Sequence, residues 1–253
     1  MIFIPPLRVR RFTVDMRELT IGQSLRLAKI PDHLDEYATT QFLRFATVDP
    51  GIDPLLWTVS ERIMGVAHYL SAVSDEGADF SVGTSGSRFS DYFIPEAEAF
   101  KAQSEPFSAA GDTWRAIHVT GRMVESLERL TGEIEGISGR EFWTLGALAA
   151  SLLREGESLP ADDAPSDEVD AWLLQRLHVF INFPESDMLS MLVQAREKAT
   201  QIQHIFKVAH DESGLIVLPK EEVAGLPPAR FPVRSTLSAW AQGMAGKPQR
   251  TGL

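Results

Sequence analysis

The sequence predicts an α+β fold that is mostly α-helical. Several segments repeat apolar residues every three or four positions, as amphipathic helices do, and three of them open with a hydroxyl residue followed three positions later by Glu or Gln. Only short segments alternate apolar and polar residues as strands do. We therefore expect about seven helices. The minor sheet elements should be an N-terminal strand at 7–14 and a small β-hairpin at 79–92.

The N-terminal segment 7–14 alternates apolar and basic residues (LRVRRFTV), which predicts one strand with a solvated face. It carries Arg8, Arg10 and Arg11, the densest positive cluster of the chain. Charged residues of this kind either protect an exposed sheet edge from unwanted pairing or dock onto an acidic partner.

Three helices are predicted in the following part of the chain, at about 20–29, 32–48 and 58–73. Thr20 and Thr58 begin the first and third with capping-box order. The predicted hairpin at 79–92 contains the Gly/Ser loop 83–87. This loop lacks the lysine of a phosphate-binding loop and the G-x-S-x-G spacing of a nucleophile elbow.

The second half should contain four helices and one strand. We expect a connector at 96–110, a helix from Asp112 to about 130 with Gly121 in its middle, and a nearly all-apolar helix from Ser138 to about 154. Two further helices are predicted at 167–182 and 186–209, the latter with Leu189 and Val193 turned inward, and a buried strand at 214–218. Residues 1–218 should form one domain with an acidic surface loop near 159–168. Residues 219–253 should form a Pro-rich C-terminal extension.

Composition restricts the classes of ligand. The chain has 253 residues, 35 acidic and 24 basic, with a net charge of −11, which disfavours nucleic acid and anionic membranes. No segment approaches the roughly 20 apolar residues of a membrane helix. Cysteine is absent, and no two histidines stand at metal-ligand spacing, so we expect no metal and no organic cofactor. The six histidines are His33, His68, His118, His178, His204 and His210.

Three stretches together resemble tail-assembly chaperones and baseplate-hub-associated proteins of tailed bacteriophages. They are VRRFTVDMRELTIGQ, then ERIMGVAHYLSAVSDEGADFSVG with the following RFSDYF, and ISGREFWTLGALAASLL. The resemblance implies a noncatalytic protein that helps to build or cap a phage tail in the host cytoplasm, with or without retention in the virion. Its partners would be other tail or baseplate proteins, or further copies of itself. The resemblance transfers no active-site residues.

Two other classes stay open from sequence alone. A hydrolase could use paired carboxylates that converge only in the fold, and a generic bacterial helical adaptor would need no site at all. For an assembly protein, arginine and aromatic side chains are the expected partner contacts because they carry a large share of interface energy. The alternative is that the aromatic residues complete the protein's own core. The candidates are Arg8, Arg10, Arg11, Arg88, Phe89, Tyr92, Phe93, Phe231 and Trp240.

Overall fold

The computed structural model describes residues 2–48, 51–83, 85–95, 100–221, 225–231 and 233–234. Within these residues the chain forms seven α-helices and ten short strands in four antiparallel sheets, which confirms the predicted mostly helical α+β class. The helices are α1 (Ile21–Leu27), α2 (Asp35–Ala46), α3 (Val59–Val73), α4 (Gly121–Arg129), α5 (Gly139–Ser151), α6 (Ser166–Ile181) and α7 (Glu185–Ile202). The strands are β1 (Leu7–Arg8), β2 (Thr13–Met16), β3 (Thr47–Val48), β4 (Ser81–Val82), β5 (Ser87–Arg88), β6 (Phe107–Ala109), β7 (Asp112–Ala116), β8 (Leu152–Arg154), β9 (Lys207–Asp211) and β10 (Gly214–Leu218).

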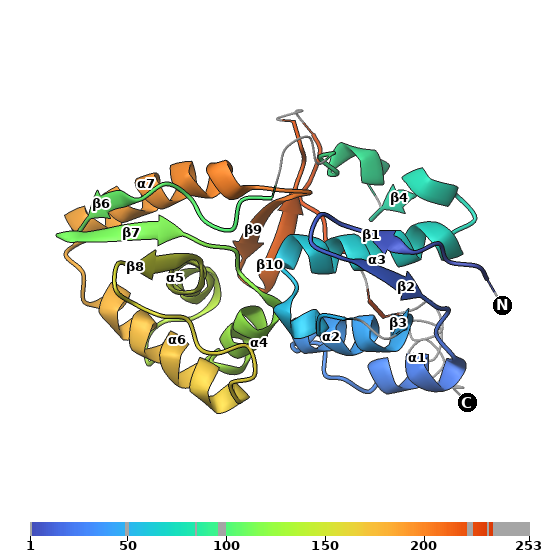
Figure 1. Cartoon of the computed structure of the whole chain (residues 1–253), viewed down its shortest axis with the longest axis horizontal. Coiled ribbons are helices and arrows are strands. Elements are labelled where there is room, and N and C mark those ends of the chain that lie inside the picture. Colours follow the sequence, from blue (N-terminus) through green and yellow to red (C-terminus); the bar gives the residue numbers. More distant parts are fainter. Residues whose placement is uncertain are drawn as a thin grey trace, which may run out of the picture.

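The molecule has two lobes that lie side by side, with β9 and β10 between them (Figure 1). The first lobe contains α1–α3 and β1–β5, and the second contains β6–β8 and α4–α7. The buried clusters follow this division. One cluster draws only on residues 107–202, whereas the other two combine residues 4–93 with residues 205–233.

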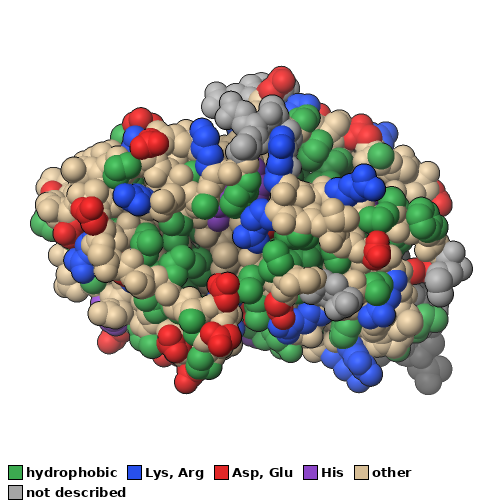
Figure 2. Space-filling view, in the orientation of Figure 1, with side chains coloured by type: hydrophobic (Ala, Val, Ile, Leu, Met, Phe, Trp, Pro, Cys, Tyr) green, Lys and Arg blue, Asp and Glu red, His purple; other side chains and the backbone are tan. Residues whose placement is uncertain are grey.

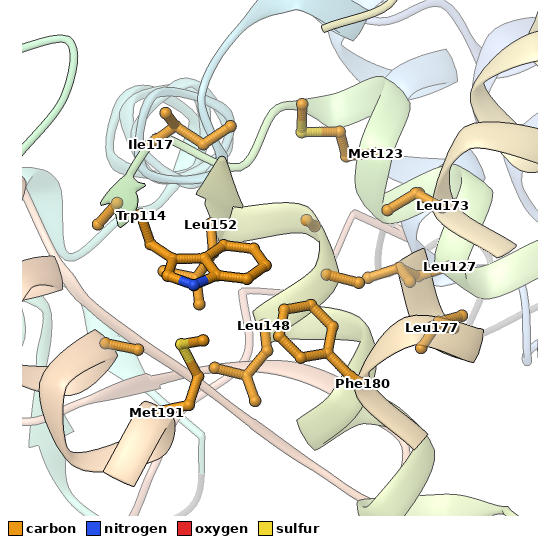
Figure 3. Packing of buried hydrophobic residues seen from close by; sticks show 14 of the residues in the cluster. Trp114, Ile117, Met123, Leu127, Leu148, Leu152, Leu173, Leu177, Phe180 and Met191 are labelled. Atoms are coloured by element: carbon orange, nitrogen blue, oxygen red, sulfur yellow. The ribbon is translucent and has the colours of Figure 1, made fainter. Parts of the chain in front are cut away.

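The second lobe is built around Trp114 of β7. Figure 3 shows its indole among Leu148 of α5, Phe180 of α6 and Met191 of α7. Trp114 is 2% exposed, and its Nε1 donates to the carbonyl of Ala109 at 3.0 Å, so its polar atom is satisfied inside the core. Burying each side chain of this size stabilises the fold by roughly 1.5–3 kcal/mol.

The single strand predicted at 7–14 is instead a hairpin. β1 and β2 pair antiparallel with Leu7 opposite Val14, and the backbone N–H of Val9 donates to Phe12. Residues seven apart point to opposite faces of a straight strand. Folding the segment back on itself places Leu7 and Val14 on one face, where both are buried. β3 then extends this sheet by pairing with β2.

The helix predicted from Asp112 is also wrong. Residues 112–116 form β7, the central strand of the sheet β6–β7–β8, and α4 begins only at Gly121. Ala110 and Gly111 both have positive φ, of 52° and 79°, which is typical of the two-residue turns that join hairpin strands. The predicted connector at 96–110 therefore contains a strand, β6.

Two long helices end earlier than the apolar pattern predicts. α5 stops at Ser151 and residues 152–154 form β8; α7 stops at Ile202 and residues 207–211 form β9, paired with the correctly predicted strand β10. Leu189 and Val193 were expected inside, but they are 58% and 69% exposed. The helix turns Met191 and Ala195 toward the core instead.

The predicted hairpin at 79–92 is confirmed only in part, because β4 and β5 have two residues each and Phe89–Asp91 is a 3-10 helix. The capping boxes at Thr20 and Thr58 are both complete, whereas Ser138 begins α5 without a side-chain hydrogen bond. In the described part of the predicted 219–253 extension, Ala229 pairs with Val217, and Phe231 and Val233 pack on the first lobe. None of the described helices is long and apolar enough to cross a membrane.

Candidate functional site

The predicted aromatic contacts lie within a cluster of the protein's own core. Tyr92 is fully buried, and its hydroxyl donates to the carbonyl of Pro227 at 2.8 Å. Phe89, Phe93 and Phe231 are half-buried and pack on one another and on Phe206, with ring centroids 5.3–6.2 Å apart. Their main role in the structure is therefore to attach the C-terminal segment to the first lobe. Trp240 lies outside the described residues.

The predicted basic contacts separate into two groups. Arg8 and Arg10 are exposed on the β1–β2 hairpin. Arg11 turns inward: its Nε donates to Glu61 Oε1 at 2.8 Å, its Nη2 donates to the Leu56 carbonyl at 2.9 Å, and its guanidinium lies 5.5 Å from the Phe100 ring centroid. Arg88 is half exposed and pairs with Glu76 at 2.7 Å. Of the three hairpin arginines, Arg8 and Arg10 are the exposed ones.

Sequence reasoning missed a group of exposed apolar side chains at the end of the first lobe that faces away from the second lobe. We call it the N-terminal apolar surface, and it consists of Ile2, Phe3, Ile21, Leu25 and Val48, which are 42–82% exposed. Figure 1 places the N-terminus, α1 and β3 at this end of the molecule. The Ile2 N–H donates to Glu18 at 2.8 Å, which holds the N-terminal segment next to the start of α1.

A signal for this surface does exist in the sequence. Ile21 and Leu25 are four residues apart and so lie on one face of α1, whereas the buried residues of that helix are Ser24 and Leu27. The helix therefore leaves one apolar face toward solvent.

A buried ionic network joins the two lobes. Arg62 of α3 is 1% exposed; its Nη1 donates to Thr40 at 2.7 Å, and its Nη2 donates to the Glu36 carbonyl at 2.8 Å and the Glu36 carboxylate at 3.2 Å. From the second lobe, Glu128 accepts the backbone N–H groups of Glu36 and Tyr37 at 2.8 and 3.1 Å. It thereby caps α2, whose own N-cap residue Leu34 makes no side-chain bond.

Burial shifts the pKa values of the two carboxyl groups in this network. It raises the pKa of Glu128 to about 7, although the two backbone N–H groups act in the opposite direction. Burial also raises the pKa of Glu36, and the Arg62 guanidinium counteracts part of that shift.

A cavity of about 280 Å³ lies beside the network, between α2, α3, β10 and residues 229–234. Its walls are mainly apolar, and its charged end holds Asp35, Glu36, Arg62 and Arg234. Arg234 pairs with Asp35 at 2.6 Å and Arg62 pairs with Glu36, so both carboxylates are engaged by guanidinium groups. These ion pairs tie residues 35 and 36 at the start of α2 to α3 and to Arg234 of the C-terminal segment.

The structure also brings together two histidines that lie 86 positions apart, which their sequence spacing could not reveal. The rings of His118 and His204 are 4.6 Å apart, and Phe100 stacks on His118. His118 Nε2 donates to the Lys101 carbonyl at 2.8 Å, and His204 Nε2 lies 3.1 Å from Thr58 Oγ1. Burial, His118 and Arg11 lower the pKa of His204 to about 4, and burial lowers that of His118.

This pair joins the lobes, because Thr58 begins α3 in the first lobe and His118 follows β7 in the second. Within the described ranges, no three His, Asp or Glu side chains are grouped so that they could hold a metal ion. Comparison of the chain with protein-family models, with curated proteins and with solved structures finds no match.

Proposed function

We propose that this chain is a noncatalytic structural or assembly protein of a phage tail or baseplate, acting in the host cytoplasm through protein–protein interfaces. The observation that carries the proposal is the N-terminal apolar surface, because grouped apolar side chains at a protein surface mark interaction sites. Phe3 alone is 82% exposed. The first stretch that resembles tail-assembly and baseplate proteins, residues 9–23, runs through this end of the molecule and contains Ile21.

The exposed charges of the first lobe support the same proposal. The chain carries a net charge of −11, yet the β1–β2 hairpin of the same lobe exposes Arg8 and Arg10. Exposed apolar and basic side chains on one lobe fit a partner that presents apolar and acidic groups, since complementary charges steer association. The partners in this proposal are other tail or baseplate proteins.

The test is co-purification of the tagged chain with the tail and baseplate proteins encoded beside its gene, identified by mass spectrometry. The double variant Ile21→Lys/Leu25→Lys should keep the wild-type melting temperature, because both side chains are already solvated, and should lose at least tenfold in affinity for the partner. The matched control is Leu189→Lys/Val193→Lys, which places the same charges on an exposed face of α7 in the other lobe. Full binding by the α1 variant would refute the proposed interface.

A further inference from the structure

The helix α1 keeps an apolar face exposed among the described residues. Ile21 and Leu25 lie one turn apart on this face and are 66% and 47% exposed. Figure 2 shows patches of apolar side chains, with Lys and Arg side chains between them, at the end of the first lobe that carries α1. Apolar side chains grouped at a surface mark a contact site, so this face is suited to a covering segment.

The last described residues of the C-terminal segment lie beside α1. Val233 is 7% exposed and belongs to the same buried cluster as Leu27, the last residue of α1. Arg234 donates from Nη2 to the Pro31 carbonyl at 2.9 Å and pairs with Asp35 at 2.6 Å. The chain is thereby anchored at Arg234 near the end of α1, and the residues that follow start next to this helix.

Residues 236–244, which lie outside the described residues, have a sequence that suits an apolar face. Leu237, Trp240, Ala241 and Met244 are spaced i, i+3, i+4 and i+7, which predicts a short amphipathic helix. Residues 235–246 contain no charged side chain, so contact with an apolar surface requires no charge to leave water.

The length of the chain after Arg234 is sufficient. The ten residues from Arg234 to Met244 span about 15 Å as a helix and about 33 Å when extended. α1 has seven residues and is therefore about 10 Å long. Even a fully helical segment can run along the whole of α1.

We propose that residues 236–244 dock on the Ile21/Leu25 face of α1 in the same chain and cover it until a protein partner displaces them. Because the segment and the face belong to one chain, the effective concentration is on the order of millimolar, so a weak contact is sufficient. The surface then alternates between a covered and an open state, and the partner binds the open state. The competition with a partner rests on the proposed function, whereas the contact within the chain does not.

The primary test uses the absence of cysteine from the chain, because one introduced cysteine gives a single labelling position. Gln242→Cys lies on the side of the predicted helix opposite Leu237 and Trp240, and it carries a nitroxide spin label in isotope-labelled protein. We expect the backbone amide NMR signals of Ile21 and Leu25 to lose most of their intensity. The signals of α7, at the other end of the molecule (Figure 1), should keep theirs. Equal loss in α1 and α7, or no loss in α1, would overturn the contact.

Two controls identify which chain provides the segment. A nitroxide at Val193→Cys, on the exposed face of α7 in the other lobe, should leave the α1 signals unchanged. A mixture of isotope-labelled wild type with unlabelled protein that carries the nitroxide at position 242 should also leave them unchanged. If the α1 signals weaken in the mixture as they do within one chain, the segment docks on a second copy and the proposal is wrong.

Variants test whether the apolar stripe makes the contact. In the spin-labelled protein, Leu237→Ser/Trp240→Ser should restore the α1 signals while the melting curve stays cooperative. The matched control, Ala239→Ser/Gly246→Ser, introduces the same residue type away from the stripe and should leave the α1 signals weakened. If the stripe variant also leaves them weakened, the contact does not depend on these apolar side chains and the proposal fails.

The competition is measured with the partner found by co-purification. Leu237→Ser/Trp240→Ser should raise the affinity for this partner by about threefold or more, because apparent affinity is proportional to the fraction of open surface. Unchanged or weaker binding would contradict the covering role. If no tail or baseplate protein binds the chain, the proposed function fails, whereas the NMR experiments, which use no partner, decide the contact within the chain separately.

Discussion

Replacing Gly121 by alanine should disrupt the contact between the lobes. Gly121 opens α4 directly against Arg62, and its N–H donates to the Trp57 carbonyl at 3.0 Å. A Cβ added at this position would lie 2.2 Å from Arg62 Nη1 and 2.8 Å from the Pro54 carbonyl oxygen. Neither distance is compatible with ordinary van der Waals contact, so one of the two neighbours or α4 itself must move.

The magnitude depends on which part moves. If Arg62 moves, its buried pairing with Glu36 and its bond to Thr40 are lost, and breaking a buried ion pair costs about 3–5 kcal/mol. If α4 moves away instead, overpacking costs about 1–3 kcal/mol and the hydrogen bond to Trp57 is weakened. Gly121→Ala should therefore lower the free energy of unfolding by about 2–5 kcal/mol.

Urea denaturation followed by tryptophan fluorescence measures this difference. Gly22→Ala is the control: a Cβ there meets only Thr20 Oγ1 at 3.9 Å, and alanine should stabilise α1 by about 0.5–1 kcal/mol through helix propensity. If Gly121→Ala unfolds within about 0.5 kcal/mol of the wild type, the packing around Arg62 is not as tight as the structure shows.

The remaining predictions concern protonation and capping. The wild type should lose stability as pH rises from about 4.5 to about 7, because burial raises the folded pKa of Glu128 to about 7 and its ionisation favours unfolding. Glu128→Gln should abolish this loss. An unchanged pH slope in urea titrations would contradict the prediction. The wild type should also lose stability as pH falls from about 6.5 to about 4, because His204 becomes protonated at a higher pH in the unfolded chain than in the folded protein. His204→Gln should abolish this second loss. The same titrations, continued to acid pH, test it. Thr58→Ala should cost about 1 kcal/mol by removing the cap on the Glu61 N–H, and a thermal melt indistinguishable from wild type would refute that role.

Local signals located most of the helices because they depend on neighbours a few residues away. Thr20 and Thr58 mark the starts of α1 and α3 through bonds that span three positions. Pro184 likewise marks the boundary between α6 and α7. Such features involve residues that are close together in the sequence, so the fold class and the approximate number of helices could be predicted.

Strands were missed because their stability comes from distant partners. Trp114 is spaced from Ile117 as in a helix, but β8, which pairs with Trp114 through Arg154, lies forty positions further along the chain. The contacts between the lobes also join residues that are far apart in the sequence. Glu128 accepts the Glu36 N–H across 92 positions, and His204 contacts Thr58 across 146. Contacts between residues so far apart in the sequence leave no local sequence pattern. A residue type can suggest a role, but only the fold decides which groups meet.

The polar contacts between the lobes explain how two lobes with separate apolar cores keep one position relative to each other. Glu128 must meet the first N–H groups of α2, and His204 must lie between His118 and Thr58. Each bond is directional, and two of them are partly buried, so a sliding of one lobe on the other would leave polar groups unsatisfied, at a cost of up to about 1–3 kcal/mol for each buried group. Apolar contacts alone would tolerate several registers. The network therefore fixes the relative position of the two lobes, and it does so with groups whose charge changes between about pH 4 and pH 7.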